Sequence, residues 1–329
     1  MKHLTFKYWL FINCAFLAAL AITAILTLNI GSEPVSIFKS PATETEIAII
    51  LYSRLPRILL GIFTGLALGS GGAAFQALLH NPLADPYILG ISGGAALGSV
   101  IGLAFGLPFA LVAMLAFAFS FLTMIFIYWT ARFHGELPAH TLLLTGVIFN
   151  AFAFALIMLI HSLVTLEQAH EILFMLIGNL EIQSYSALAV VGMLVFAGFI
   201  VLCLMSKKLN GISLGDETAQ SLGIDIARSR KIIFFAASLM IGSVVSVSGL
   251  IGFVGLFIPH AVRLVFGSDN RLLVPVCGFF GAVFLVWSDT LARTILMHGS
   301  YQTQLPVGVI TALIGGPAFV YLLKKSMNK

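Results

Sequence analysis

Residues 54–100 read RLPRILLGIFTGLALGSGGAAFQALLHNPLADPYILGISGGAALGSV, and this stretch decides how the chain folds. A polar break, His80-Asn81-Pro82, separates two apolar runs that are both rich in glycine, alanine and serine. The runs are long enough to cross a bilayer, and small residues at this density let helix backbones approach closely. The stretch therefore predicts two transmembrane helices packed against other helices rather than against lipid.

The composition extends this prediction to the whole chain. Of its 329 residues, 60% are hydrophobic and 9% are charged, whereas soluble domains have roughly 45–50% and 25%. A transmembrane helix needs about 20 apolar residues, so a chain of this length accommodates on the order of ten with short loops. We expect an all-α polytopic membrane protein that forms a single transmembrane domain over residues 1–329. The expected spans are 8–30, 55–79, 87–105, 109–130, 141–163, 187–205, 232–250, 249–266, 272–295 and 305–323.

The distribution of positive charge sets the orientation of these spans. With both termini in the cytoplasm, all but four of the 17 lysines and arginines fall on the cytoplasmic side, as the positive-inside rule requires. The net charge of +4 is therefore typical of cytoplasmic loops and does not indicate a nucleic-acid partner. The four exceptions are Lys39, Arg54, Arg57 and Arg293.

The sequence shows no sign that the chain catalyses a reaction. We find no HExxH and no pair of carboxylates inside a span, and the three cysteines form no CxxC pair. We expect no catalytic residue, no metal site and no cofactor. Asp289 and Arg293 are spaced i, i+4, which favours mutual neutralisation over a proton relay.

If the chain is an active transporter, its energy must come from an ion gradient or from a separate ATPase. No lysine follows a glycine, so the chain has no P-loop. An ion-coupled carrier would usually hold ionisable groups near mid-membrane, and these are scarce here. Three classes stay open: a transporter that borrows an ATPase, an ion-coupled secondary transporter, and a structural or sensory membrane subunit.

Two segments outside the spans have both an ordinary and a functional interpretation. Arg54, Arg57 and Arg293 lie at external helix ends, where arginines often only reach toward lipid head groups; alternatively, they form a basic ring that binds carboxylates of a partner or an anionic ligand. The segment 206–231 is either a solvated cytoplasmic loop or a docking element for a cytoplasmic partner. Its centre has Ala219 and Leu222 on one helical face, between Gly215 and Gly223.

Long motifs in a fixed order give the chain a family resemblance. The opening stretch resembles the FecCD-type permeases, the membrane subunits of ABC importers for iron–siderophore complexes, haem and vitamin B12. Downstream motifs that agree are LGDETAQSLGI at 214–224, SGLIGFVGLFIPHAVR at 248–263, SDTLAR at 288–293 and LPVGVITALIGGPAFVYLL at 305–323. The resemblance covers nearly the whole chain, except that residues 31–52 carry no family motif.

The resemblance implies a type II ABC importer permease with ten transmembrane helices in the bacterial inner membrane. It implies a homodimer in membrane lipid with a translocation path along the dimer interface, two copies of a cytoplasmic ABC ATPase beneath it, and a periplasmic or extracellular substrate-binding protein above it. Nucleic acid is not an expected partner. An iron chelate, siderophore or haem, is the expected substrate, and vitamin B12 (cobalamin) is the alternative.

The resemblance also assigns residues to these roles. Arg54, Arg57 and Arg293 are expected to face glutamates of the binding protein. The coupling segment that enters the ATPase is expected to comprise Gly215, Asp216, Glu217, Ala219, Leu222 and Gly223. Residues of the opening stretch are expected to line the path or to pack its helices, and they are Gly65, Gly69, Gly71, Gly72, Gln76, Asn81, Pro82, Gly93 and Gly94.

Overall fold

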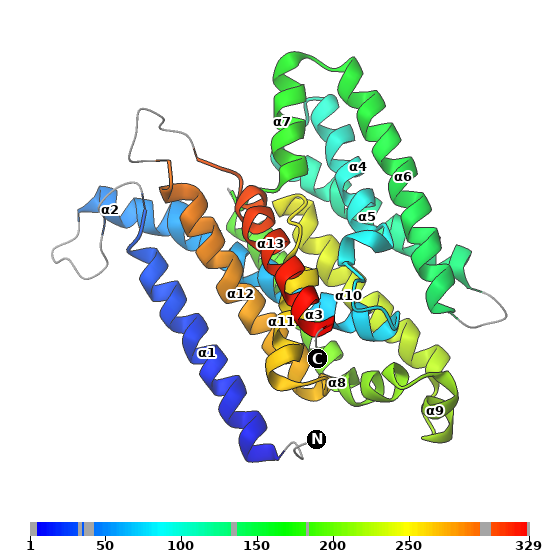
Figure 1. The fold of residues 1–329 in the computed structure, drawn as a ribbon. Helices are drawn as coiled ribbons and strands as arrows, with labels where there is room; N and C mark the ends of the chain where they lie inside the picture. The colour runs from blue at the N-terminus through cyan, green and yellow to red at the C-terminus, as the bar shows by residue number, and fades with distance from the viewer. Residues whose placement is uncertain are drawn as a thin grey trace.

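The computed structural model describes residues 5–31, 35, 43–132, 137–181, 184–296 and 304–327, and every regular element in them is helical (Figure 1). Eight helices within these ranges are long and apolar enough to cross a membrane: α1 (Phe6–Leu28), the continuous α2–α3 helix (Glu44–Leu78), α5 (Phe109–Ala131), α6 (Ala139–Leu163), α8 (Tyr185–Ser213), α10 (Ile226–Ser248), α12 (Asn270–Thr294) and α13 (Val307–Met327). Two shorter apolar helices, α4 (Ile91–Ala104) and α11 (Val254–Phe266), fall within the third and eighth expected spans. The predicted all-α polytopic membrane fold is confirmed.

Helix α3 (Leu55–Leu78) forms the centre of the bundle, with α8, α10, α11 and α12 packed around it. Its glycines make this possible because they let the neighbouring backbones come close. A Cβ atom at Gly69 would lie 2.1 Å from the carbonyl oxygen of Cys277 in α12, and one at Gly72 would lie 2.1 Å from that of Gly255 in α11. The prediction that this stretch packs against helices is therefore confirmed.

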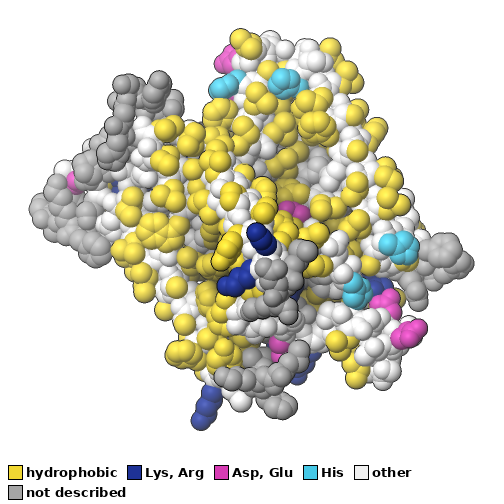
Figure 2. Space-filling view, in the orientation of Figure 1, with side chains coloured by type: hydrophobic (Ala, Val, Ile, Leu, Met, Phe, Trp, Pro, Cys, Tyr) yellow, Lys and Arg dark blue, Asp and Glu magenta, His cyan; other side chains and the backbone are white. Residues whose placement is uncertain are grey.

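The outer helices present apolar side chains to the surroundings. Met114 of α5, Phe154 of α6 and Met193 of α8 are each at least 60% exposed. In Figure 2 hydrophobic side chains cover most of the visible face, while most of the visible lysines and arginines gather near the C-terminus and along the lower edge. Such a surface is stable only where lipid replaces water, so the chain is a multi-pass membrane protein.

Two of the expected spans are shorter than predicted, because their first residues do not continue an α-helix. Residues Pro86–Leu89 form a 3₁₀ turn (η2), and Gly90 at φ 82° then redirects the chain into α4. Before α11, Gly249 (φ 69°) and Phe253 (φ 70°) hold the chain outside helical geometry. The predicted starts at residues 87 and 249 are therefore wrong.

Two other boundaries also differ from the sequence prediction. The second span begins at α2 (Glu44–Ile49), where Thr43 and Glu46 form a capping box, and a π-helical turn at Ile50–Arg54 joins α2 to α3. Helix α3 begins at the expected residue 55, but the continuous span begins earlier, at Glu44. Helix α8 likewise continues past residue 205 to Ser213, so only 214–225 lies between α8 and α10, rather than the predicted 206–231. Serine and lysine at 206–208 do not break a helix, whereas Gly215 at φ 107° does.

The two ends of the bundle differ in what they display. We call the end that carries Arg57 and Arg293 the arginine end; it also holds the short helix α7 (Leu166–Ile177). We call the opposite end the α9 end, after α9 (Asp216–Ser221), which lies at the bottom of Figure 1 together with the N-terminus. The candidate sites lie at these two ends.

Candidate functional site

A buried ion cluster lies at the arginine end. The Asp289 carboxylate of α12 accepts hydrogen bonds from Arg57 Nε at 2.9 and 3.1 Å and from Arg293 Nε at 3.0 Å. The side chains of Asp289, Arg57 and Arg293 are only 3%, 10% and 7% exposed. The predicted neutralisation of Arg293 by Asp289 is confirmed, and a second arginine, 232 residues away in sequence, shares the same carboxylate.

The third arginine lies outside this cluster. Arg54 Nη1 donates to the carbonyl oxygens of Leu28 and Val35, at 2.7 and 3.0 Å. Arg54 is itself only 3% exposed. It thereby ties the end of α1 and the segment after it to the start of α3. The structure thus unites Arg57 with Arg293 and places Arg54 on a separate set of backbone acceptors.

Two amide side chains complete the surroundings of Arg57. Arg57 Nη1 donates to Gln304 Oε1 at 3.0 Å, and Nη2 donates to Asn179 Oδ1 at 3.4 Å. Asn179 follows α7 and Gln304 precedes α13, so one guanidinium group connects four segments. Sequence reasoning missed both amides, because a single neutral residue in a linker carries no pattern.

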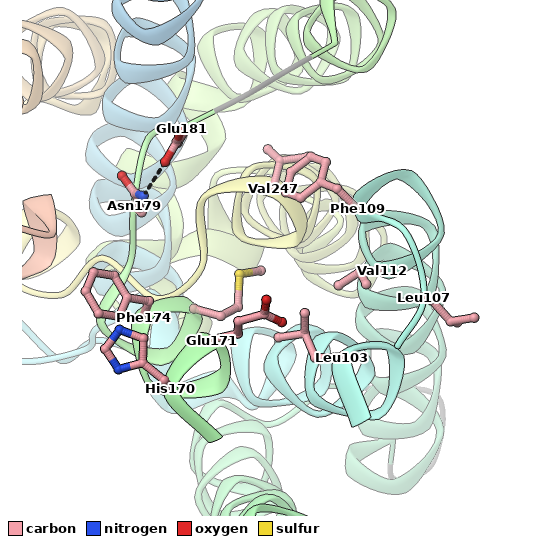
Figure 3. A pocket seen from close by; sticks show the side chains of 11 residues that line it. Leu103, Leu107, Phe109, Val112, His170, Glu171, Phe174, Asn179, Glu181 and Val247 are labelled. Atoms are coloured by element: carbon pink, nitrogen blue, oxygen red, sulfur yellow. Dashed lines mark hydrogen bonds between the residues drawn. The ribbon is translucent and has the colours of Figure 1, made fainter. Parts of the chain in front are cut away.

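Two cavities open beside this cluster. One of about 290 Å³ is lined by Arg57 and Gln304 together with Tyr52, Ser53, Pro56, Glu181, Ser184 and Tyr185. The other, of about 490 Å³, lies between α7 and the apolar ends of α4 and α5. In Figure 3 the Glu171 carboxylate points toward the middle of this cavity, His170 lies beside Phe174, and a dashed line joins Asn179 to Glu181. The segment Asn179–Glu181 therefore lies between the ion cluster and the larger cavity, whose lining is partly polar and partly apolar.

The small residues of the opening stretch lie at contacts within this chain. Gly65 and Gly69 face α12, Gly71 faces Ile241 of α10, and Gly72 faces α11. In α4, Gly93 lies against Asn150 of α6 and Gly94 against Thr123 of α5. These glycines therefore pack helices, and a role in lining a path stays a prediction.

The polar residues of that stretch lie at the end of α3 and in the turn that follows it. Buried Gln76 accepts from Arg263 Nη2 at 3.1 Å, and its amide nitrogen faces the carbonyl oxygens of Gly255 and Leu256. Asn81 Oδ1 accepts from the Leu83 N–H at 2.9 Å, which stabilises the turn, and Pro82 is exposed. Gln76 thus links α3 to α11 near the α9 end.

At the α9 end a short helix projects from the bundle. Ala219 is fully buried, whereas Asp216, Glu217, Leu222 and Gly223 are exposed. Asp216 accepts from Arg230 Nη2 at 2.6 Å, and that arginine side chain in α10 is 5% exposed. A cavity of about 580 Å³ beside this pair is lined by Gly215, Glu217, His80 and His140, among others. Helix α9 therefore rests on the bundle through a buried methyl group, contacts both α8 and α10, and is tied to α10 by one ion pair.

Replacing Arg230 with methionine is expected to loosen α9 without unfolding the bundle. Methionine keeps the apolar contacts of the arginine stem but leaves Asp216, which is 49% exposed, to be solvated. A half-exposed ion pair contributes about 0.5–1 kcal/mol, so mobility of α9 should rise while the thermal unfolding midpoint changes little. Site-directed spin labels on α9 measure this mobility. Arg228→Met, which removes the same charge from an exposed position, should leave it unchanged; equal mobility in both variants contradicts the role of the ion pair.

Comparison with known proteins relates nearly the whole chain to one family of membrane transport proteins. The model of the FecCD transport family matches residues 13–325. The hemin transport system permease protein of Yersinia pestis is 36% identical, over 95% of each chain. The vitamin B12 import system permease protein of Vibrio vulnificus is 35% identical, over 97% of this chain and 96% of that one. A solved metal-chelate type ABC transporter in an inward-facing conformation superposes with a TM-score of 0.86 at 29% identity, over 95% of this chain and 99% of that one.

Within the described residues, no group of three or more His, Cys, Asp and Glu side chains is placed to hold a metal ion. The described polar groups gather instead at the two ends of the bundle, as an arginine cluster at one end and an acidic short helix at the other.

Proposed function

Because this chain belongs to the FecCD transport family, we propose that it is the permease subunit of an ATP-driven importer that carries an iron chelate, a siderophore complex or haem, across the bacterial inner membrane. A homodimer of the chain forms the path, with both termini in the cytoplasm. Two ABC ATPase subunits supply the energy from below, and a substrate-binding protein delivers the chelate from outside. The single transmembrane domain spans the whole chain.

One observation carries this proposal most directly. Helix α9 is a short, acidic, exposed helix held at the end of the bundle opposite the arginine cluster. An ATPase that moves α9 would move α10, because Arg230 joins the two. At its far end α10 meets the α7 linker, where the Asn179 N–H donates to the Ser248 carbonyl oxygen at 2.8 Å. Closure of the ATPase would thus act on the arginine end through one continuous helix.

The relatives support the choice of substrate class. Their names refer to hemin, iron chelatin, Fe(3+)-citrate and vitamin B12, all of which are complexes of a metal ion with a larger organic ligand. We place iron chelates first and cobalamin second. We further propose that Arg54, Arg57 and Arg293 contact the binding protein and that residues 215–223 contact the ATPase. The small and polar residues assigned above within 54–100 are proposed to line the path or to pack its helices.

Uptake into proteoliposomes tests the substrate. The permease is reconstituted with its ATPase and ATP inside, its binding protein outside, and radiolabelled iron–siderophore, haem or cobalamin in parallel samples. Accumulation of an iron chelate above the level without binding protein is the expected result. Accumulation of cobalamin alone would establish the alternative, and accumulation of none of the three would contradict the proposed function.

A further inference from the structure

A cavity of about 490 Å³ lies between three helices at the α9 end, and we call it the α1–α8–α12 cavity. It is lined by the start of α1, by residues near the end of α8 and by the first two turns of α12. None of its lining residues belongs to the cavities or the ion pairs described above. Helix α1 lies at the edge of the bundle beside α12 (Figure 1). Phe6 and Leu204, which line the cavity, are 74% and 70% exposed, so it borders the outer surface that lipid covers.

The described residues that line this cavity include two cationic side chains and no acidic one. Arg271, which is 40% exposed, donates to the Asp269 carboxylate through Nε and Nη2. The same carboxylate accepts from Asn210 Nδ2 at 2.7 Å. Among the described residues, no carboxylate lies within ion-pair distance of Lys207, which is exposed. Asp269 therefore balances Arg271, and Lys207 leaves the cavity with one net positive charge.

The lining changes from charged to apolar with depth in the membrane. Helix α8 runs toward the α9 end, so Leu204 lies about one turn deeper than Lys207. Helix α12 runs away from that end, so Pro275 lies about one turn deeper than Arg271. Two helices from different parts of the chain thus place a cation at the membrane surface and an apolar side chain below it. A ligand that fits both layers carries a negative charge at one end and hydrocarbon at the other.

Helix α1 contributes an aromatic wall to the same cavity. The rings of Phe6 and Trp9 stack with their centroids 6.1 Å apart, and Trp9 Nε1 donates to the Arg271 carbonyl oxygen at 2.9 Å. Such amphipathic rings are typical of the membrane–water interface, where lipid head groups lie. The first turn of α1 contains no acidic residue, so the partial positive charge at the start of this helix adds to that of Lys207.

We propose that the α1–α8–α12 cavity is a binding site for an anionic phospholipid. Its phosphate group lies at Lys207 and Arg271, and its acyl chains lie along Trp9, Leu204 and Pro275. A free phosphate ion shares the charge of this ligand but leaves the apolar layer unfilled, so the lipid is the occupant that satisfies both layers. The bound lipid joins α1 to α8 and α12. This inference goes beyond the proposed function and does not depend on it.

The affinity of the full-length permease for single lipids tests this site. The protein in detergent is titrated with phosphatidylglycerol or with phosphatidylcholine of the same acyl chains, and native mass spectrometry measures the affinity for the first bound lipid. We expect phosphatidylglycerol to bind about five-fold more tightly, because one net positive charge at the membrane surface favours an anionic lipid by about this factor. Equal affinities for the two lipids would overturn the proposal.

A matched pair of lysine variants locates the site. Lys207→Gln removes the unbalanced charge from the cavity and should make the two lipids bind equally. Lys208→Gln removes the neighbouring charge, from a residue that does not line the cavity, and should keep the five-fold preference. A preference that survives in Lys207→Gln, or that both variants lose alike, would overturn the assignment to this cavity.

Soluble anions distinguish the lipid from a free phosphate. Inorganic phosphate and glycerophosphoglycerol, which carry the charge without acyl chains, are added in excess to the permease with bound phosphatidylglycerol. The account predicts that neither displaces the lipid, because neither fills the apolar layer. Displacement by inorganic phosphate would show that the cavity takes a free anion and would overturn the lipid assignment.

A bound lipid that joins α1 to the bundle should also stabilise the fold. The thermal unfolding midpoint of the wild type and of Lys208→Gln should rise by about 2 °C in phosphatidylglycerol relative to phosphatidylcholine. Lys207→Gln should show no such rise. A rise of the same size in Lys207→Gln would overturn the role of this lipid in joining the helices.

Discussion

Replacing Gly69 with alanine is expected to separate α3 from α12 and to destabilise the permease by about 1–3 kcal/mol. The added methyl carbon would stand 2.1 Å from the carbonyl oxygen of Cys277, with the Cys277 carbonyl carbon at 2.9 Å. Backbone atoms cannot rotate away as a side chain can, so the two helices must move apart. Because α3 also packs against α8, α10 and α11, the displacement should spread through the centre of the bundle.

The thermal unfolding midpoint in detergent and the fraction of monodisperse protein measure this loss. Gly252→Ala is the matched control, because it adds the same methyl group where no atom lies within 4 Å. The expected result is a clear loss of both quantities in the Gly69 variant and none in the control. Equal behaviour of the two variants would show that the close approach of α3 and α12 is not needed.

Replacing Ala219 with phenylalanine is expected to abolish the coupling between the permease and its ATPase. The Ala219 methyl group is fully buried where α9 rests on the bundle, and Gly215 at φ 107° turns the chain into this helix. A phenyl ring does not fit there, so α9 must lift or rotate. We expect substrate-stimulated ATP hydrolysis to fall at least about ten-fold, which corresponds to about 1.4 kcal/mol, while the ATPase still co-purifies.

Ala219→Ser provides the control for this prediction, since it adds one oxygen atom instead of a ring. Hydrolysis is measured in proteoliposomes with binding protein and substrate present. Stimulation that survives in the Phe variant, with the ATPase still bound, would show that α9 does not transmit the signal.

The sequence predicted the architecture well because the bilayer imposes a simple rule. Ten apolar segments were expected, and each contains a helix. The errors lie at boundaries. Residues 206–213 are polar but helical, and residues 87–90 are apolar but do not form an α-helix. Polarity marks the depth of a residue in the membrane, whereas backbone torsion decides where a helix begins and ends.

The candidate site was only partly predictable, for a related reason. The spacing of Asp289 and Arg293 indicates their pairing, because i and i+4 share a helix face. The bond from Arg57 to the same carboxylate joins residues 232 apart, and nothing in the local sequence indicates it. A basic ring at external helix ends was one interpretation of the three arginines, and in the structure these residues are only 3%, 9% and 6% exposed. Charge placement thus singled out the three arginines, and only the fold revealed which groups they bind.

Dependence of uptake on ATP tests the central claim most directly. Proteoliposomes that contain this permease and its ATPase are supplied with binding protein and iron chelate outside, and with ATP or a non-hydrolysable analogue inside. The account predicts that the chelate accumulates only with hydrolysable ATP and that a protonophore has no effect. Accumulation by the permease alone, driven by an ion gradient and abolished by the protonophore, would contradict it.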